Sequence, residues 1–178
     1  MGVLKELVSS TDPILKQSTV SFDFENPPID PMDLAEEMRY NMITHRGIGL
    51  ASPQIGYNYS VFAVGNPDVK ESILVFFNPK IVHYSDDLVL MDEACLSFPG
   101  MTFKIKRPSD IRMRFTGATG ITETMRFNGM TARVAQHEYD HLHGITFDTK
   151  VNKFHLEKAK RRKTLYNRKK RKNRLPST

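Results

Sequence analysis

The sequence predicts an α+β fold, built from two helices with antiparallel strands between them. Three observations predict it: a helical repeat after residue 30, an alternating apolar pattern between residues 111 and 127, and a second helical stretch near residues 130–142. At 178 residues, folding buries well over half of the surface that the unfolded chain exposes, so the core needs no covalent cross-link. The composition, 39% hydrophobic and 26% charged, is typical of a globular protein.

The first helix is predicted to begin after Asp30, whose side chain suits an N-cap, with Pro31 in the first helical position. The run is expected to end at Gly47. Within it, apolar residues recur every fourth position at Leu34, Met38 and Met42. This spacing predicts one buried face, so we expect both methionines to pack in the core.

Short runs rich in β-branched and aromatic residues predict strands at residues 59–65 and 73–77, the second stopped by Asn78-Pro79. The alternation farther along predicts a hairpin around the turn GATG, with one face buried. That buried face would be formed by Ile111, Met113, Phe115, Ile121, Met125 and Phe127. The second helix is expected from about Met130 to Leu142, with Gly144 as its C-cap.

Charge divides the chain into two parts. Residues 1–152 hold 14 Lys and Arg against 19 Asp and Glu, whereas residues 153–178 hold 12 Lys and Arg against Glu157 alone. We therefore expect a domain at residues 1–150 and a basic C-terminal extension at residues 151–178. The extension has too few apolar residues to build a core, and we expect it to be helical up to Pro176 or disordered.

The composition also excludes several classes of protein. A single cysteine rules out an internal disulfide framework. No apolar run approaches the roughly eighteen residues that a transmembrane helix needs, so we expect no membrane partner. The N-terminal residues lack the composition of a signal or transit peptide, and the predicted location is the cytoplasm.

Residues 137–141 read HEYDH, which is the spacing of a metal-binding helix. On a helix, His137 and His141 lie on one face with Cβ atoms about 5–6 Å apart, so two imidazoles can share one divalent metal. Glu138 flanks them as a candidate base. A catalytic metal site needs a third protein ligand and one open position, and the only cysteine, Cys95, is the natural candidate. The other histidines are expected on the surface: His45, His83, His143 and His155.

A third stretch, GIGLASPQIG at residues 47–56, follows the first helix. Its two glycines allow the backbone to approach a ligand, but it lacks the Gly-Lys-Ser/Thr ending of a phosphate loop. Taken alone, this segment is equally consistent with a simple turn. Gln54 is a polar side chain in an apolar setting and needs a hydrogen-bond partner.

Together these stretches resemble the motifs of the peptide deformylase family, which are GxGLAAPQ, EGCLS and QHExDH in that order. They stand here as GIGLASPQ at 47–54, EACLS at 93–97 and QHEYDH at 136–141. The resemblance covers residues 5 to 150. It implies antiparallel sheets around a central helix that carries the HEXXH metal motif.

The resemblance also implies an activity: removal of the N-formyl group from the N-terminal formyl-methionine of nascent polypeptides, with release of formate. Glu138 would be the general base and acid, while the Gln54 amide and the Leu96 N–H would donate hydrogen bonds to the formyl oxygen. The usual ion is Fe(II), and the ligand types also permit Zn(II), Ni(II) or Co(II). The ligands would be Cys95, His137 and His141.

By the same resemblance, a set of residues would surround the substrate's methionine side chain: Ile48, Gly49, Met91 and Val134. Glu93 would pair with Arg107 to support the strand that carries the cysteine. Two positions depart from the family pattern. Ala94 replaces a glycine, which disfavours positive φ and adds a methyl group beside a metal ligand. Ser52 replaces an alanine, and its hydroxyl needs a partner if it is buried.

Two other functions remain open from the residues. HEXXH alone also suits a zinc peptidase. The second alternative is a basic RNA-binding protein in which the metal-binding helix is structural. Against it, a structural zinc site needs a fourth protein ligand. For a deformylase, the basic extension would bind rRNA near the ribosomal tunnel exit, with Tyr166 able to stack on a base. We expect a monomer.

Overall fold

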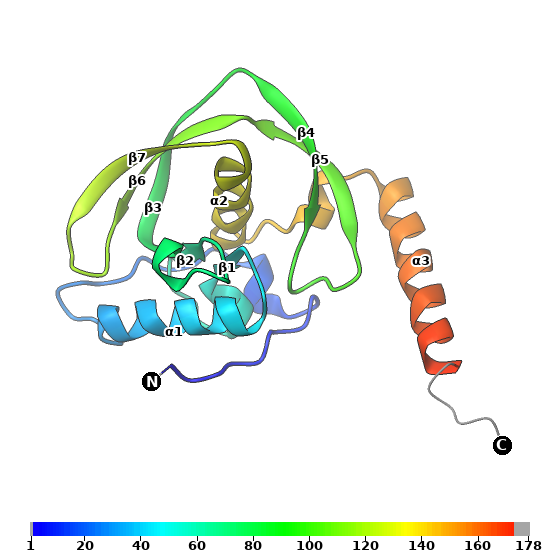
Figure 1. Cartoon of the computed structure of the whole chain (residues 1–178), viewed down its shortest axis with the longest axis horizontal. Coiled ribbons are helices and arrows are strands. Elements are labelled where there is room, and N and C mark those ends of the chain that lie inside the picture. The colour runs from blue at the N-terminus through cyan, green and yellow to red at the C-terminus, as the bar shows by residue number, and fades with distance from the viewer. Residues whose placement is uncertain (1, 173–178) are drawn as a thin grey trace.

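The computed structural model describes residues 2–172, whose elements are labelled in Figure 1. The helices are α1 (Pro31–Thr44), α2 (Gly129–Leu142) and α3 (Lys153–Lys172). The strands are β1 (Gly49–Ala51), β2 (Val61–Val64), β3 (Leu74–Tyr84), β4 (Leu88–Ala94), β5 (Thr102–Pro108), β6 (Asp110–Thr116) and β7 (Thr122–Asn128). Short 3₁₀ turns stand at Pro13–Lys16, Ser52–Ile55, Lys70–Ser72 and Phe147–Lys150.

The strands form two antiparallel sheets. A five-stranded sheet has the order β1-β2-β3-β6-β7, and β4 pairs with β5 as a separate two-stranded sheet. In Figure 1, α2 lies between the long strands β3, β6 and β7 and the β4–β5 hairpin, while α1 lies near β1 and β2. The predicted α+β class is therefore confirmed, and α2 is placed where residues from both sheets reach it.

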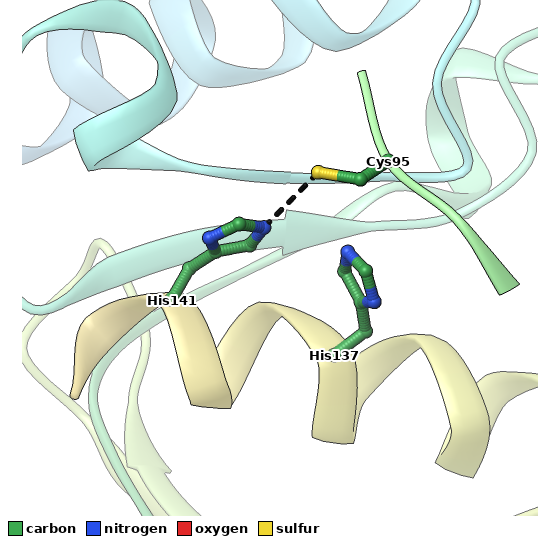
Figure 2. Close-up of side chains that lie close together, drawn as sticks. All are labelled: Cys95, His137 and His141. Carbon is green, nitrogen blue, oxygen red and sulfur yellow. Dashed lines mark hydrogen bonds between the residues drawn. The ribbon is translucent and has the colours of Figure 1, made fainter. Parts of the chain in front are cut away.

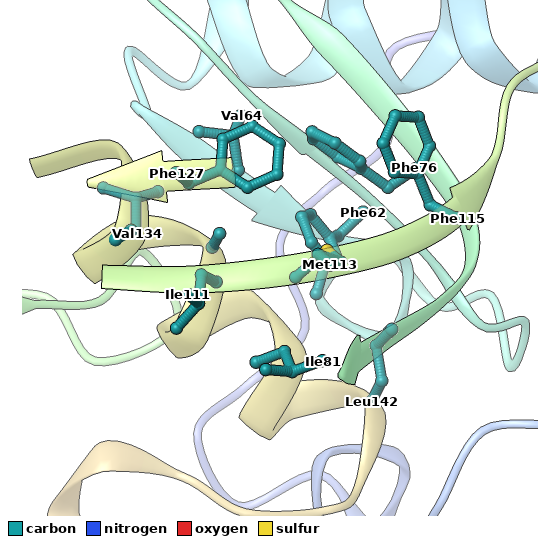
Figure 3. Close-up of a cluster of buried hydrophobic side chains, with 13 residues drawn as sticks. Phe62, Val64, Phe76, Ile81, Ile111, Met113, Phe115, Phe127, Val134 and Leu142 are labelled. Carbon is teal, nitrogen blue, oxygen red and sulfur yellow. The ribbon is translucent and has the colours of Figure 1, made fainter. Parts of the chain in front are cut away.

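Two apolar clusters hold these elements together. One fills the space between α2 and the five-stranded sheet, and Figure 3 shows its side chains, among them Phe62, Phe76 and Val134. The other joins α1 to the sheet through Leu34, Met38 and Met42, which are fully buried as their spacing predicts. The predicted cap of α1 is also present, because Asp30 Oδ1 accepts hydrogen bonds from Met32 N at 2.9 Å and Asp33 N at 3.1 Å.

The strand expected at 73–77 does not stop at Asn78-Pro79. It continues as β3 to Tyr84, with a shift in its pairing with β6 between Phe77 and Lys80. Asn78 adopts a φ of 48° and its side chain bonds Phe22 N at 2.7 Å and Phe22 O at 2.8 Å. The bulge accommodates a proline that cannot donate to the ladder, which is why a strong stop signal lies inside a strand.

The hairpin of β6 and β7 is confirmed, but its buried face is only partly as predicted. The β6 residues Ile111 and Met113 are fully buried, whereas Ile121 and Met125 are 61% and 37% exposed. Strand β7 is at the edge of the sheet, and Phe127 is its one buried residue. The β4–β5 hairpin was not among the predicted strands, and Cys95 directly follows β4.

The second helix ends at Leu142 with His143 as its C-cap, so the predicted Gly144 stands one residue beyond the cap, where it stops the helix. Gly144 has a φ of 67°, and the N–H groups of Gly144 and Ile145 bond His141 O at 3.2 Å and Asp140 O at 3.0 Å. These two hydrogen bonds end the helix, with Gly144 in the left-handed conformation that glycine adopts most easily. A Cβ at this position would lie 2.7 Å from the Lys16 carbonyl carbon, so the tight packing also requires glycine.

The basic extension is helical from Lys153 to Lys172, and its expected stop at Pro176 lies outside the described residues. Its first turns are attached to the body, because Leu156 and Ala159 pack against a cluster that contains Phe103 and Phe147. In Figure 1 the remainder of α3 extends away from the other elements. No helix within residues 2–172 is long and apolar enough to cross a membrane.

Candidate metal centre and active site

The structure brings together the three residues that the sequence singled out as metal ligands. The ligand atoms of Cys95, His137 and His141 all lie within 4.8 Å of one another, and all three residues are buried. Figure 2 shows the two histidines on α2 turned toward Cys95, with Cys95 Sγ 3.3 Å from His141 Nε2. Cys95 sits in the turn after β4, where its carbonyl accepts a bond from Phe98 N at 3.0 Å. One thiolate and two imidazoles are a fitting donor set for a divalent transition metal.

The pKa values of the two histidines are shifted in opposite directions. Burial lowers the pKa of His137, but hydrogen bonds with Cys95 and Glu93 outweigh burial and raise that pKa to about 10. Burial and the charges of His137 and Arg107 lower the pKa of His141 to about 3. A bound metal would favour the form of each ring that has a free nitrogen, because a ligating imidazole nitrogen carries no proton.

Glu93 is a buried carboxylate that fixes the orientation of His137. Its Oε2 accepts from His137 Nδ1 at 3.0 Å, which leaves Nε2 of that ring for a metal. Its two oxygens also accept from Arg107 Nε at 2.6 Å and Arg107 Nη2 at 2.9 Å. The expected pair of Glu93 and Arg107 is thus confirmed. Although burial raises the pKa of Glu93, hydrogen bonds from Arg107, His137 and Arg133 hold that pKa well below its usual range.

Arg133 is a member of this network that the sequence reasoning missed. Its Nη1 donates to Glu93 Oε1 at 2.9 Å and to Ile105 O at 2.8 Å, and its Nη2 donates to Val89 O. The arginine thereby ties α2 to both strands of the β4–β5 hairpin. A signal was present in the sequence, because Arg133 precedes His137 by four residues and so shares its helix face.

Glu138 lies beside the ligand group and has an unused oxygen. Its Oε2 is buried and has no hydrogen-bond partner within the described part of the chain. Burial raises the pKa of Glu138 to about 7, against the opposing charges of His137 and Arg107. A carboxyl group with this pKa exchanges protons readily near neutral pH.

Gly49 lets the backbone of β1 pass directly over Glu138. A Cβ at Gly49 would lie 2.5 Å from Glu138 Oε1 and 2.5 Å from Val134 Cγ1, which is closer than atoms can approach. Any side chain at this position would therefore displace the carboxylate. This close approach is the physical reason for the second glycine of the GIG sequence.

Gln54 is buried with its amide fixed in one orientation. Its Oε1 accepts from Ala51 N at 2.8 Å, and its Nε2 donates to Ser97 Oγ at 3.3 Å and toward Cys95 Sγ at 3.5 Å. Because the oxygen is held by a backbone donor, the amino group must face the metal ligands. The predicted need of Gln54 for a partner is met in this way.

These residues line a cavity of about 450 Å³, called here the main cavity. Among the predicted site residues, its lining includes Ile48, Gly49, Gln54, Cys95, Leu96, Val134, His137 and Glu138. Met91, half-buried on β4 opposite Ile105, is not among the lining residues. Met130 and Arg133 also line the cavity, and neither was among the predicted site residues.

The two departures from the family pattern have simple structural outcomes. Ala94 is exposed at the margin of the main cavity, and it is not among the residues with positive φ, so alanine is accommodated without backbone strain. Ser52 is buried, and its hydroxyl donates to Tyr59 O at 2.5 Å. The remaining histidines are exposed except His45, which is half-buried with its Nε2 2.9 Å from Lys5 O.

Comparisons with known proteins agree with this geometry. The chain is 38% identical over 146 residues to peptide deformylase 1B, chloroplastic/mitochondrial, of Arabidopsis thaliana, a match that covers 80% of this chain and 52% of the relative. The chain thus spans about half the length of that curated relative.

Two solved structures share the fold. A peptide deformylase from Synechococcus elongatus in complex with actinonin has a TM-score of 0.83 at 29% identity, covering 90% of this chain and 88% of that one. A Met-Ala-Ser-bound class I type b peptide deformylase from Acinetobacter baumannii has a TM-score of 0.76 at 26% identity, covering 85% and 100%. The sequence model of the polypeptide deformylase family matches residues 4–157. With that match over most of its length, the chain belongs to the polypeptide deformylase family.

Proposed function

We propose that this protein removes the N-formyl group from the N-terminal formyl-methionine of nascent polypeptides and releases formate. The observation that carries the proposal is the buried group of Cys95, His137 and His141, with Glu138 beside it at the wall of the main cavity. A cavity of about 450 Å³ has room for a methionine side chain and the adjoining peptide groups. We place the activity in the cytoplasm, in a compartment with bacterial-type translation.

The three ligands would hold one divalent metal, for which we propose Fe(II), while Zn(II), Ni(II) and Co(II) also suit the donor set. When bound, the metal supplies Lewis-acid polarisation and lowers the pKa of a water molecule toward neutrality. Glu93 orients His137 for metal binding by accepting a hydrogen bond from its Nδ1. A structural zinc site would need a fourth protein ligand, and the group found among residues 2–172 has three.

The remaining steps fall to side chains whose positions are fixed. Glu138 takes a proton from the attacking water and later delivers it to the leaving amine, as its pKa of about 7 allows. The Gln54 amino group and the Leu96 N–H donate to the formyl oxygen as negative charge develops on it. One such donor contributes about 3–4 kcal/mol to transition-state stabilisation. Ile48, Gly49 and Val134 would surround the methionine side chain.

The test of this function is formate release from formyl-Met-Ala-Ser by protein purified without oxygen, together with metal analysis. We expect release of formate, no cleavage of the internal peptide bonds, and loss of release after chelation with the fold retained. Cleavage of internal bonds would indicate a peptidase instead. A protein that releases no formate with one equivalent of any of the four metals would contradict the proposal.

Gly49→Ala is predicted to reduce formate release by at least about 10²-fold, because the new methyl group displaces the Glu138 carboxylate and removes its proton transfer. The measurement is kcat/KM on formyl-Met-Ala-Ser. Gly117→Ala is the matched control, since a Cβ there lies 3.8 Å or more from its nearest neighbours. Equal activity of the two variants would contradict the role of this close approach.

We propose further that residues 1–150 form the catalytic domain and that the basic extension binds ribosomal RNA. The extension holds 12 of the 26 Lys and Arg residues and one acidic residue, whereas the body carries more acidic than basic residues. The positive charge is therefore concentrated on the segment that begins with the projecting helix α3. Val151, Leu156 and Ala159 of the extension pack against the apolar cluster that contains Cys95, Phe103 and Phe147. A truncation that tests the extension should therefore leave these three residues in place. A cut after Lys150 would expose that cluster, so a cut after Thr164 is the cleaner test.

Truncation after Thr164 removes six of the 12 basic residues of the extension: Arg168, Lys169, Lys170, Arg171, Lys172 and Arg174. We expect weaker ribosome binding with little change in the hydrolysis of a small formyl-Met peptide. If six cations meet phosphates in the intact chain, log K should fall with log salt at a slope of roughly −4 to −5. Sedimentation with ribosomes at several salt concentrations measures both quantities. Binding of equal strength and salt dependence after truncation would show that these residues do not contact RNA.

A further inference from the structure

The two faces of the five-stranded sheet are covered to different extents. The face toward α2 is covered by the cluster that contains Phe62, Phe76 and Met113. The opposite face is covered by α1 over β1, β2 and the beginning of β3, through the cluster that contains Met38 and Phe77. Beyond Phe77, the residues of β3, β6 and β7 that point to this second face are exposed or half-buried. Within the described chain, this part of the sheet is therefore an open surface.

The register of the strands places four cations and a histidine on this open surface. Arg112 of β6 lies opposite Arg126 of β7 and opposite His83 of β3, while Arg114 lies opposite Lys80. Residues directly opposite each other in antiparallel strands point to the same face. A shift in the pairing of β3 adds one residue between Lys80 and His83, so both point outward although they are three positions apart. All five residues are exposed, and together they are called here the basic sheet face.

Like charges are direct neighbours on the basic sheet face. The facing pairs are Arg112 with Arg126 and Arg114 with Lys80, and like charges directly opposite each other destabilise a sheet. Stability therefore does not explain why cations occupy these positions. An anion bound across the face would relieve the repulsion between them.

Acidic side chains of the body leave most of this charge unbalanced. Arg126 Nε donates to Asp110 Oδ2 at 2.7 Å, and among residues 2–172 it forms the one salt bridge of the face. The acidic residue of β7, Glu123, lies opposite Phe115 and so points to the other face. The acidic pair at residues 86–87 lies beyond the face, in the turn after β3. Residues 1–152 hold more acidic than basic residues, yet four of their 14 Lys and Arg gather here.

The chemistry of the face suits the phosphates of a nucleic-acid strand. A guanidinium group matches a phosphate with two parallel hydrogen bonds. Arg112 and Arg114 are two positions apart on one strand, or roughly 6.8 Å, and the neighbouring strands lie about 4.8 Å away, so the cations cover an area that several phosphates can occupy. The other outward residues of β6 and β7 are the threonines at 116, 122 and 124, so these strands offer hydroxyl donors and no apolar side chain for insertion into a lipid surface.

We propose that the basic sheet face binds the phosphate backbone of single-stranded RNA, with His83 able to stack on a base. In Figure 1, β3, β6 and β7 lie on the opposite side of α2 from α3, so this surface is separate from the basic extension. The choice of RNA over DNA rests on the proposed function, which places the protein beside translating ribosomes. The binding itself does not depend on hydrolysis of a formyl group.

The test is photo-cross-linking of the full chain to a 4-thiouridine-labelled oligouridine of about 12 nucleotides, with the cross-linked peptides mapped by mass spectrometry. We expect cross-links in β3, β6 or β7 besides any in the extension. Below saturation, the yield at each site follows the binding constant of that site, so the two surfaces are measured separately. The double variant Arg112→Thr, Arg114→Thr should lower the yield in β3 and β7 by about 25-fold at about 0.1 M salt and leave the yield in the extension unchanged. The size follows from a slope of about 0.7 per phosphate in log K against log salt, applied to two contacts over the decade below 1 M.

The matched control is the double variant Lys104→Thr, Lys106→Thr, which removes the same charge from two exposed, alternating positions of β5. It should leave the yield on the basic sheet face unchanged. A conservative variant, Arg112→Lys with Arg114→Lys, keeps both charges and should keep the salt slope. By urea unfolding, the threonine variant of the arginines should be at least as stable as the unchanged protein, because it removes repulsion and threonine suits a strand.

Four outcomes would overturn the proposal. They are the absence of cross-links in β3, β6 and β7, an equal loss in the Lys104 and Lys106 variant, lower stability of the threonine variant of the arginines, and a loss in the conservative variant as large as in the threonine variant. Sedimentation with phosphatidylserine vesicles that needs the arginines, without RNA cross-links in these strands, would assign the face to a lipid surface instead. Formate release should be equal in all variants, so failure of RNA binding would leave the deformylase function intact.

Discussion

Glu138→Ala is expected to lower kcat/KM for formyl-Met-Ala-Ser by about 10²- to 10⁴-fold, the range that general acid–base catalysis supplies. The residue carries protons and belongs to none of the three ligand positions, so the metal content should remain at that of the unchanged protein. The free energy of unfolding should not fall, because Glu138 Oε2 is buried without a partner in the described structure and its burial opposes folding. Formate release, metal analysis and urea unfolding measure the three quantities.

Two further variants make this prediction specific. Glu138→Gln keeps the size of the side chain but cannot exchange a proton, so it should lose nearly as much activity as the alanine variant. Glu123→Ala changes an exposed carboxylate on β7 and should retain full activity. If Glu138→Ala retained activity within tenfold of the unchanged protein, the proton transfer would have to be assigned to another group.

Glu93→Gln is expected to reduce the free energy of unfolding by about 3–5 kcal/mol, the usual cost of removing one partner from a buried ion pair. Glu93 accepts from Arg107, Arg133 and His137, and both arginines are buried. An amide would leave two guanidinium groups without their shared counter-charge. The measurement is urea unfolding of the metal-free protein at pH 7.

The same variant should weaken metal binding by about 10- to 100-fold, since removing the acceptor of a ligating histidine has effects of this size. Competition with a chelator measures the affinity separately from activity. Glu36→Gln is the control, because its pair with Lys70 is exposed and should contribute less than about 1 kcal/mol. Equal stability and equal metal affinity of the two variants would show that Glu93 neither balances the arginines nor orients His137.

Residues adjacent in the sequence were predictable because helical geometry alone relates them. The spacing of His137, Glu138 and His141 fixes their relative positions on α2, and Gly144 and Asp30 mark helix ends through local hydrogen bonds. The apolar repeat of α1 identified its buried face for the same reason. The pairing of Cys95 with the histidines came from its chemistry and from the resemblance between motifs, and the structure confirms that these residues meet.

Other features depend on contacts between distant parts of the chain. The strand β3 passes through Asn78-Pro79 because Phe22, far away in the sequence, bonds the Asn78 side chain at the bulge. Ile121 and Met125 have the alternation of a buried face, but they lie before and within the edge strand β7, where no described layer covers them, so they remain exposed.

The sequence alone determined the α+β class, the helix that carries the histidines, the choice of Cys95, His137 and His141 as candidate metal ligands, and the separation of an acidic body from a basic extension. Only the tertiary structure decided that Arg133 shares Glu93 with Arg107, that Met91 stays outside the main cavity, and that the basic sheet face gathers cations from three strands. The physical reason is that local sequence sets which face of a helix or strand a residue occupies. The packing of separate elements then sets what that face meets, and hence the charge balance and the shape of the main cavity.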